Sequence, residues 1–242
     1  SFENYFTRDA YISAAVFYKK LKSYIYNQTD QSHDFSDFIA TLPSCFPGPA
    51  PNCISNIQTT GSFTGPVNGQ GGKLKGAEFA LSVQGSMFGE ALDGFGATVS
   101  VSLTDSNISI QDPPGNNFIT GNGLGDISLP GLSKTVWNAM LYYEKYGFSA
   151  RIATRARSKY IGEVTNFAND RSFKFVKGDQ ITDLQVGYAF GDATRLRGVS
   201  MLLQVNNLTN EPYIAYARIG TRQQDYQEYG RQVLLGINYK LQ

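Results

Sequence analysis

The sequence predicts an all-β fold, specifically an antiparallel transmembrane β-barrel, and three observations lead to that class. Its segments of strand character are long, the connections between them alternate in length, and side chains alternate between apolar and polar along each segment. Strands of soluble domains usually have about five or six residues, whereas a tilted strand that crosses a bilayer needs about nine to eleven. Aromatic residues make up 13% of the 242 residues, which is typical of an ordered chain. No run reaches the roughly 18 consecutive apolar residues of a membrane helix, so the sequence argues against a helical membrane protein.

A repeat of two residues in the apolar pattern marks about nine predicted strands. They are residues 1–6, 10–26, 72–86, 95–110, 133–143, 147–161, 180–190, 199–207 and 229–241.

The connections between these strands alternate between short and long. Short connections are predicted at 7–9, 89–94, 144–146 and 191–198, and long ones at 27–71, 111–132, 162–179 and 208–228. Outer-membrane barrels have short periplasmic turns and long extracellular loops, so the pattern orients the sheet relative to a membrane. A soluble β-sandwich has no reason to produce it.

Alternation along the predicted strands separates a lipid-facing side from a lumen-facing side. In segment 147–161 the apolar side chains of Phe148 and Ile152 share one face, and Arg151, Arg155 and Arg157 share the other. An arginine turned toward lipid near the midplane costs about 2 to 4 kcal/mol, so we expect the arginine face to line a wet lumen. The same alternation places Glu78 toward the lumen. In segment 10–26 apolar side chains occur on both faces, and neither face is assigned.

The two cysteines, Cys45 and Cys53, lie in a stretch that cannot form a helix. Three of the seven residues between them are proline, which forces the chain to turn. We expect a local disulfide, which implies an oxidising compartment such as a periplasm or a cell surface. The alternative is two unpaired thiols in a loop.

The sequence offers no pattern typical of an enzyme, and we predict that the protein is not one. The single histidine, His33, has no nucleophile at a meaningful spacing, and two cysteines with one histidine do not make a zinc site. We therefore predict no catalytic residue, no metal and no cofactor. The net charge of +1 also removes any case for a nucleic acid partner.

Residues that can bind a small ligand gather in the predicted loop between the last two strands. Aromatic faces with amides and arginines suit sugars or the anionic oxygens of an iron chelate. For any single tyrosine the alternative is the interfacial aromatic girdle of such barrels. The ligand-binding candidates are Tyr213, Tyr216, Arg218, Arg222, Gln223 and Tyr226.

Four motifs in order resemble the TonB-dependent outer-membrane receptors. Residues 206–213 resemble that family's N-L-x-(D/N)-x-x-Y signature, and residues 229–241 resemble its closing strand, G-R-x-x-x-x-G-x-x-Y-x-F. Residues 68–78 are similar to its N-x-G-x-x-x-x-K-G-x-E strand opening, and residues 129–151 to the long receptors of proteobacteria. Each motif is weak alone, but together they are specific.

The resemblance implies a barrel of about 22 strands in a bacterial outer membrane, with its lumen filled by a plug domain. The chain would then be the C-terminal part of the barrel over residues 1–242, with the plug and the N-terminal strands outside it. Its partners would be membrane lipid, the plug of the same polypeptide, the TonB energy transducer and a scarce nutrient, either a carbohydrate or an iron siderophore. The alternatives are a non-transporting barrel, used for adhesion or as a passive pore, and a soluble β-sandwich binding module.

Overall fold

The computed structural model describes residues 1–7, 10–42, 58–109, 126–167, 170–191, 193–217 and 222–240. Its strands are β1 (Phe2–Tyr5), β2 (Tyr11–Leu21), β3 (Ile25–Asp34), β4 (Thr60–Asn68), β5 (Gly72–Gln84), β6 (Phe95–Ser109), β7 (Asp126–Ile127), β8 (Thr135–Lys145), β9 (Phe148–Arg157), β10 (Tyr160–Phe167), β11 (Asp170–Val176), β12 (Asp179–Ala189), β13 (Val199–Asn206), β14 (Tyr213–Ala217), β15 (Arg222–Gln227) and β16 (Gln232–Tyr239). One short helix, α1 (Ser36–Ala40), and two 3-10 turns, Gly85–Met87 and Glu90–Leu92, complete the described elements.

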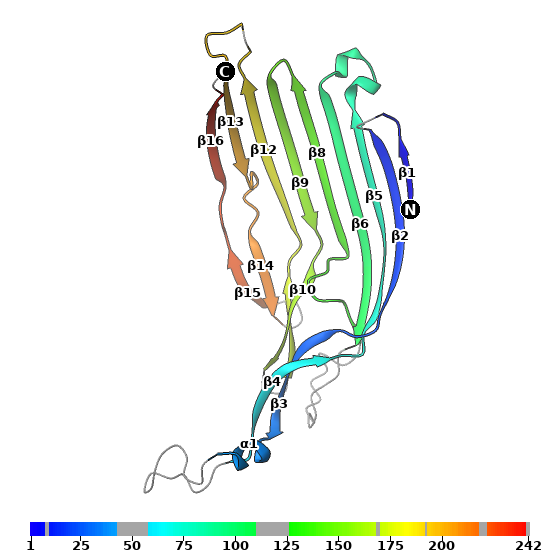
Figure 1. Ribbon diagram of the computed structural model, residues 1–242, viewed down its shortest axis with the longest axis vertical. Coiled ribbons are helices and arrows are strands. Elements are labelled where there is room, and N and C mark those ends of the chain that lie inside the picture. The colour runs from blue at the N-terminus through cyan, green and yellow to red at the C-terminus, as the bar shows by residue number, and fades with distance from the viewer. Residues whose placement is uncertain are drawn as a thin grey trace.

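The main body is one antiparallel sheet in the order β1-β2-β5-β6-β8-β9-β12-β13-β16, with β7 paired to β6. Apart from the strands within the long connections, strands that are neighbours in the sheet are also consecutive along the chain, as in an up-and-down barrel. The sheet confirms the predicted all-β antiparallel fold. It is not closed, because β1 and β16 are its two edges. Figure 1 shows the short connections at one end of the sheet and the long ones at the other.

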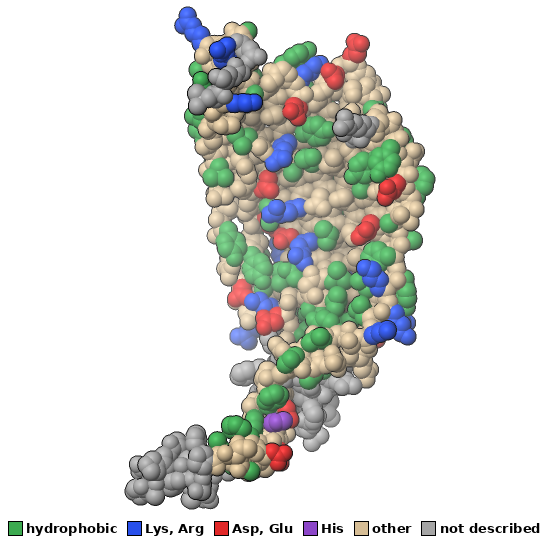
Figure 2. All heavy atoms as spheres, viewed as in Figure 1, with side chains coloured by type: hydrophobic (Ala, Val, Ile, Leu, Met, Phe, Trp, Pro, Cys, Tyr) green, Lys and Arg blue, Asp and Glu red, His purple; other side chains and the backbone are tan. Residues whose placement is uncertain are grey.

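The strand register gives the sheet one apolar and one polar face. Residues paired directly across strands lie on the same face, and one row joins Leu141 of β8, Ile152 of β9 and Leu184 of β12. A row on the opposite face joins Asn138 of β8 to Arg155 of β9. In Figure 2, Lys or Arg and Asp or Glu side chains gather along the middle of the sheet, over the region of β9 and β12.

Register also assigns the faces of β2, which alternation alone left open. Val16 pairs with Ala77 and Tyr18 with Lys75 of β5, so both lie on the apolar face. Phe17 pairs with Gly76 and lies on the polar face. A side chain at position 76 would collide with the Phe17 ring, because a Cβ there would stand 2.5 Å from its Cζ. The absence of a side chain at Gly76 therefore lets an aromatic ring occupy the polar face.

Large apolar side chains of the sheet remain exposed. Leu141 is 53% exposed and Leu235 is 70% exposed, and no second layer covers them in the part of the chain that the structure describes. At the short-turn end this face carries aromatic rings: the centroids of Phe95 and Tyr143 are 4.6 Å apart, and Phe148 follows 6.1 Å from Tyr143. A continuous apolar face with an aromatic border is the lipid-facing surface of a membrane barrel. It is unlike a sandwich, in which a second sheet would cover that face.

Segment 10–26, predicted as one strand, is divided between two sheets. β2 pairs with β5 as far as Leu21, and the chain then bends so that β3 pairs with β4 in a separate two-stranded sheet. The bend fits closely against Gly71, whose φ is +72° and whose Cβ would stand 2.3 Å from the Leu21 carbonyl oxygen. The predicted loop at 27–71 therefore contains a hairpin, which Figure 1 shows projecting beyond the sheet with α1 at its far end.

Three other predicted connections were also wrong in detail. The connections at 162–179 and 208–228 contain strands, because apolar and aromatic residues such as Phe173, Phe175 and Tyr216 find backbone partners there. The tight turn predicted at 144–146 falls at Tyr146 and Gly147, with φ of 54° and 80°. Positive φ at both central residues is the geometry that closes a two-residue hairpin. Within the described residues, no helix has the length and apolar character of a membrane span.

Candidate functional site

The ligand-binding candidates that the structure describes lie on the hairpin formed by β14 and β15, at the long-connection end of the sheet. Tyr216 pairs with Gln223, and Tyr226 pairs with Ile214 on the same face of the hairpin. Tyr213 belongs to the opposite face, because it lies one residue before Ile214 along β14. The hairpin therefore splits the predicted set between two surfaces.

Arg222 pairs with Ala217 and shares the face of Tyr213, away from Tyr216, Gln223 and Tyr226. Arg218 lies outside the described residues.

Cys45 and Cys53 also lie outside the described residues, so the disulfide between them remains a prediction.

Two long connections form one four-stranded sheet in the order β10-β11-β14-β15, which the sequence did not predict. Strand β11 pairs with β14 through Lys174 and Ala217, Phe175 and Tyr216, and Val176 and Ala215. Val176 is 4% exposed and Ala215 is fully buried, so the junction has a small apolar core. We call this four-stranded unit the loop sheet.

An ion pair crosses the loop sheet on the face that carries Tyr213. Lys174 Nζ lies 2.6 Å from Asp225 Oδ2, and both side chains are about one third exposed or less. The hydrogen bond to Asp225 and its negative charge hold the pKa of Lys174 above its ordinary value, although partial burial opposes this. The pair joins β11 to β15 across β14 and makes the two connections one unit.

The segment that resembles the N-L-x-(D/N)-x-x-Y signature forms a tight asparagine-centred turn between β13 and β14. Asn207, with φ of +52°, accepts a hydrogen bond at Oδ1 from the Glu211 backbone N–H at 2.8 Å. Its Nδ2 donates to the backbone oxygens of Glu211 at 3.2 Å and of Gly230 at 3.3 Å. Asparagine suits this position because it tolerates positive φ and offers both donors and an acceptor. The turn thus fixes where the loop sheet leaves the barrel wall.

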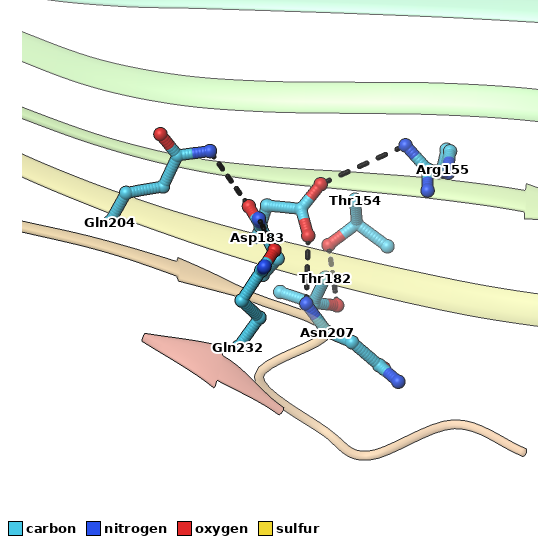
Figure 3. Close-up of polar contacts among 8 residues, drawn as sticks. Thr154, Arg155, Thr182, Asp183, Gln204, Asn207 and Gln232 are labelled. Carbon is cyan, nitrogen blue, oxygen red and sulfur yellow. Dashed lines mark hydrogen bonds and ion pairs between the residues drawn. The ribbon is translucent and has the colours of Figure 1, made fainter. Parts of the chain in front are cut away.

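Asp183 of β12 connects this turn to the polar face of the sheet (Figure 3). Its Oδ1 accepts a hydrogen bond from the Asn207 backbone N–H at 2.9 Å, and its Oδ2 lies 3.8 Å from Arg155 Nη1. Behind it, the hydroxyls of Thr154 and Thr182 are 3.0 Å apart. Arg155 therefore pairs with a carboxylate of the neighbouring strand. Glu78 of β5 lies on the same polar face, as its register shows, but three strands away from Arg155.

A polar hollow of about 940 Å³ opens on this face beside the turn. Among the predicted ligand residues that the structure describes, only Tyr213 lines it. The sequence did not predict the other lining residues as a ligand site, because they come from several separate strands and turns. Its charged and hydrogen-bonding lining comprises Arg155, Asp179, Asp183, Gln204, Asn206, Asn207, Glu211, Tyr213, Tyr229, Arg231 and Gln232. Carboxylates, amides and phenol rings facing one open hollow can bind a ligand rich in hydroxyl groups.

The other two predicted lumen arginines differ in their contacts. Arg157 donates from Nε to Ser133 Oγ and from Nη2 to the Gly131 carbonyl, both at 3.0 Å, and its guanidinium lies 3.7 Å from the Tyr160 ring centroid. It therefore fastens the connection before β8 to the wall. Arg151 has no ion-pair partner among the described residues. It lines a second hollow of the polar face, of about 770 Å³, together with Gln185, whose buried Oε1 has no hydrogen-bond partner there.

These features define a class: a β-sheet with a lipid-facing apolar side, short turns at one end and structured loops at the other is the wall of an outer-membrane barrel. Residues 1–208 match the model of the family described as TonB dependent receptor-like, beta-barrel. The chain belongs to this family, which is found in the bacterial outer membrane and consists of transporters rather than enzymes. Comparison with curated proteins and with solved structures gave no match.

Proposed function

We propose that the chain is the C-terminal part, over residues 1–242, of a plugged barrel that imports a scarce nutrient with energy from the TonB complex. The open sheet supports this proposal, because β1 and β16 each present an edge that a longer barrel would pair. Arg151 and the buried oxygen of Gln185 support a plug of the same polypeptide, since a polar domain in the lumen would supply their missing partners. The long connections then face the cell exterior and the short turns the periplasm.

The polar hollow beside the Asn207 turn is the observation that carries the choice of ligand. Its charged lining holds Asp179, Asp183 and Glu211 against only Arg155 and Arg231. An excess of carboxylates disfavours an anionic iron chelate, whereas a sugar can donate hydrogen bonds from its hydroxyl groups to carboxylates and stack the C–H face of its ring on tyrosine rings. We therefore place a carbohydrate first and a ferric siderophore second.

Binding by the intact receptor, purified in detergent, tests the choice. We expect neutral oligosaccharides to bind and Tyr213→Ala to weaken that binding by roughly tenfold, because the ring lines the hollow. Tyr226→Ala is the matched control, since Tyr226 is 52% exposed on the opposite face of the hairpin and does not line the hollow. Binding of ferric chelates but of no oligosaccharide would replace the first ligand class by the second.

Growth of a receptor-deletion strain on the bound nutrient separates a transporter from an adhesive or passive barrel. We expect the restored receptor to support growth only when the TonB complex is intact. Equal growth without the TonB complex would identify a passive pore, and binding without any growth would identify an adhesive barrel.

A further inference from the structure

Three lysines lie together on the apolar face of the sheet, where it meets the long-connection end. The register pairs Lys20 of β2 with Lys73 of β5, and it pairs Lys75 of β5 with Tyr18 on one side and Asp105 on the other. All three lysines are exposed. We call Lys20, Lys73 and Lys75 the lysine patch.

The patch begins where the apolar band ends. On β6 the lipid-facing residues from Phe95 to Leu103 are apolar, and the next two on that face are Asp105 and Asn107. At a rise of about 3.3 Å per residue and a tilt of about 40°, the band from Phe95 to Leu103 is about 20 Å tall. Asp105, the next residue on that face and the partner of Lys75, lies about 25 Å above Phe95, which is the height of a barrel's apolar band. Lys75 and Lys73 are therefore level with the lipid head groups.

Two of the three charges of the patch are not balanced by the residues that the structure describes. Lys75 Nζ lies 3.4 Å from Asp105 Oδ2, an exposed pair, but neither Lys20 nor Lys73 has an acidic partner among the described residues. Like charges directly opposite each other in an antiparallel pair destabilise the pairing. An anion from the membrane would relieve this repulsion between two lysines at the head-group level.

We propose that the lysine patch is a binding site for the phosphate groups of outer-leaflet lipid. Two unpaired ammonium groups on adjacent strands can bind one phosphate from both sides, and Tyr18 in the neighbouring row lies at the interfacial level where a phenol contacts both acyl chains and head groups. The acyl chains of such a lipid would lie along the apolar band below. This site is on the opposite face of the sheet from the polar hollow. Of the proposed function, it depends only on the long connections facing the cell exterior.

Lipid binding by the intact receptor in detergent tests the proposal, with lipid A and its dephosphorylated form as probes. We expect lipid A to bind, the dephosphorylated form not to bind, and Lys20→Gln with Lys73→Gln to lower the affinity by about twenty-five-fold, at about fivefold for each lysine. The matched control is Lys19→Gln, because Lys19 precedes Lys20 on the same strand but pairs with Leu74 on the polar face. Equal affinity in the double variant and the wild type, or an equal loss in the control, would overturn the proposal.

Two further measurements distinguish lipid binding from binding of free phosphate and from a folding defect of the variant. If the site takes the whole lipid, 50-fold excess inorganic phosphate does not displace it, whereas complete displacement would show that free phosphate suffices. Thermal unfolding without phosphorylated lipid should leave the double variant at least as stable as the wild type, because the repulsion between Lys20 and Lys73 is removed. Lower stability of the variant there would mean that the lysines serve the fold. These measurements need no transport, so their failure would leave the proposed function untouched.

Discussion

Replacing Asn207 should release the loop sheet from the barrel wall. Its side chain makes the hydrogen bonds to Glu211 and Gly230 that hold the turn, while its backbone N–H donates to Asp183. Asn207→Ala removes the three side-chain bonds and places an alanine at a φ of +52°. Asn207→Gly removes the same bonds but tolerates the positive φ.

The expected cost follows from these contacts. Each neutral hydrogen bond contributes about 0.5 to 1.5 kcal/mol, so the three bonds together are worth about 2 to 4 kcal/mol at this half-buried position. The left-handed conformation adds about 1 kcal/mol for alanine and little for glycine. We therefore expect Asn207→Ala to cost about 3 to 5 kcal/mol and Asn207→Gly about 1 kcal/mol less.

Amide hydrogen exchange at Glu211 measures this directly, since its N–H is the donor to Asn207 Oδ1. A loss of about 3 kcal/mol accelerates exchange on the order of 100-fold when local opening controls it. Asn210→Gly is the control: Asn210 also has positive φ, at 57°, but its side-chain amide donates to the exposed Glu228 carboxylate and not to the backbone of the turn. Unchanged exchange in Asn207→Gly, or equal exchange in the alanine and glycine variants, would refute the reasoning.

Three other predictions test the faces, the loop sheet and the turn. A cysteine at Ile152 should react with a lipid-soluble reagent and one at Arg155 only with an aqueous reagent, and reversed labelling would contradict the register. Because the pKa of Lys174 is raised above its ordinary value of 10.5, its pairing with Asp225 stabilises the loop sheet below pH 10.5, and this stabilisation is lost as the pH rises through the folded pKa. Amide hydrogen exchange of the loop sheet should therefore accelerate above pH 10.5 in the wild type but show no such step in Lys174→Met. Gly147→Ala should destabilise the β8–β9 hairpin by about 1 to 2 kcal/mol in a urea titration, because the φ of Gly147 is +80° and a Cβ would stand 2.4 Å from the Ala189 carbonyl oxygen. An unchanged free energy of unfolding would exclude this turn geometry.

The sequence by itself determined the class of fold and the two sides of most strands. Alternation is a local property, because successive side chains of a strand point to opposite faces wherever its partners lie. Residues such as Arg155 and Ile152 could therefore be assigned to opposite faces before any pairing was known. Connection length is also visible along the chain, and it predicts how the sheet is oriented relative to the membrane.

Only the tertiary structure decided which distant segments pair. The faces of β2 depended on its register with β5, and the loop sheet depended on β11 meeting β14, about forty residues further along the chain. Backbone pairing is available to almost any sequence, so a short apolar stretch such as Tyr213–Ala217 does not specify its partner locally. The contact between Asp183 and Asn207 also depends on strand pairing. The sequence around either residue does not indicate the other, and the antiparallel register of β12 and β13 places them together.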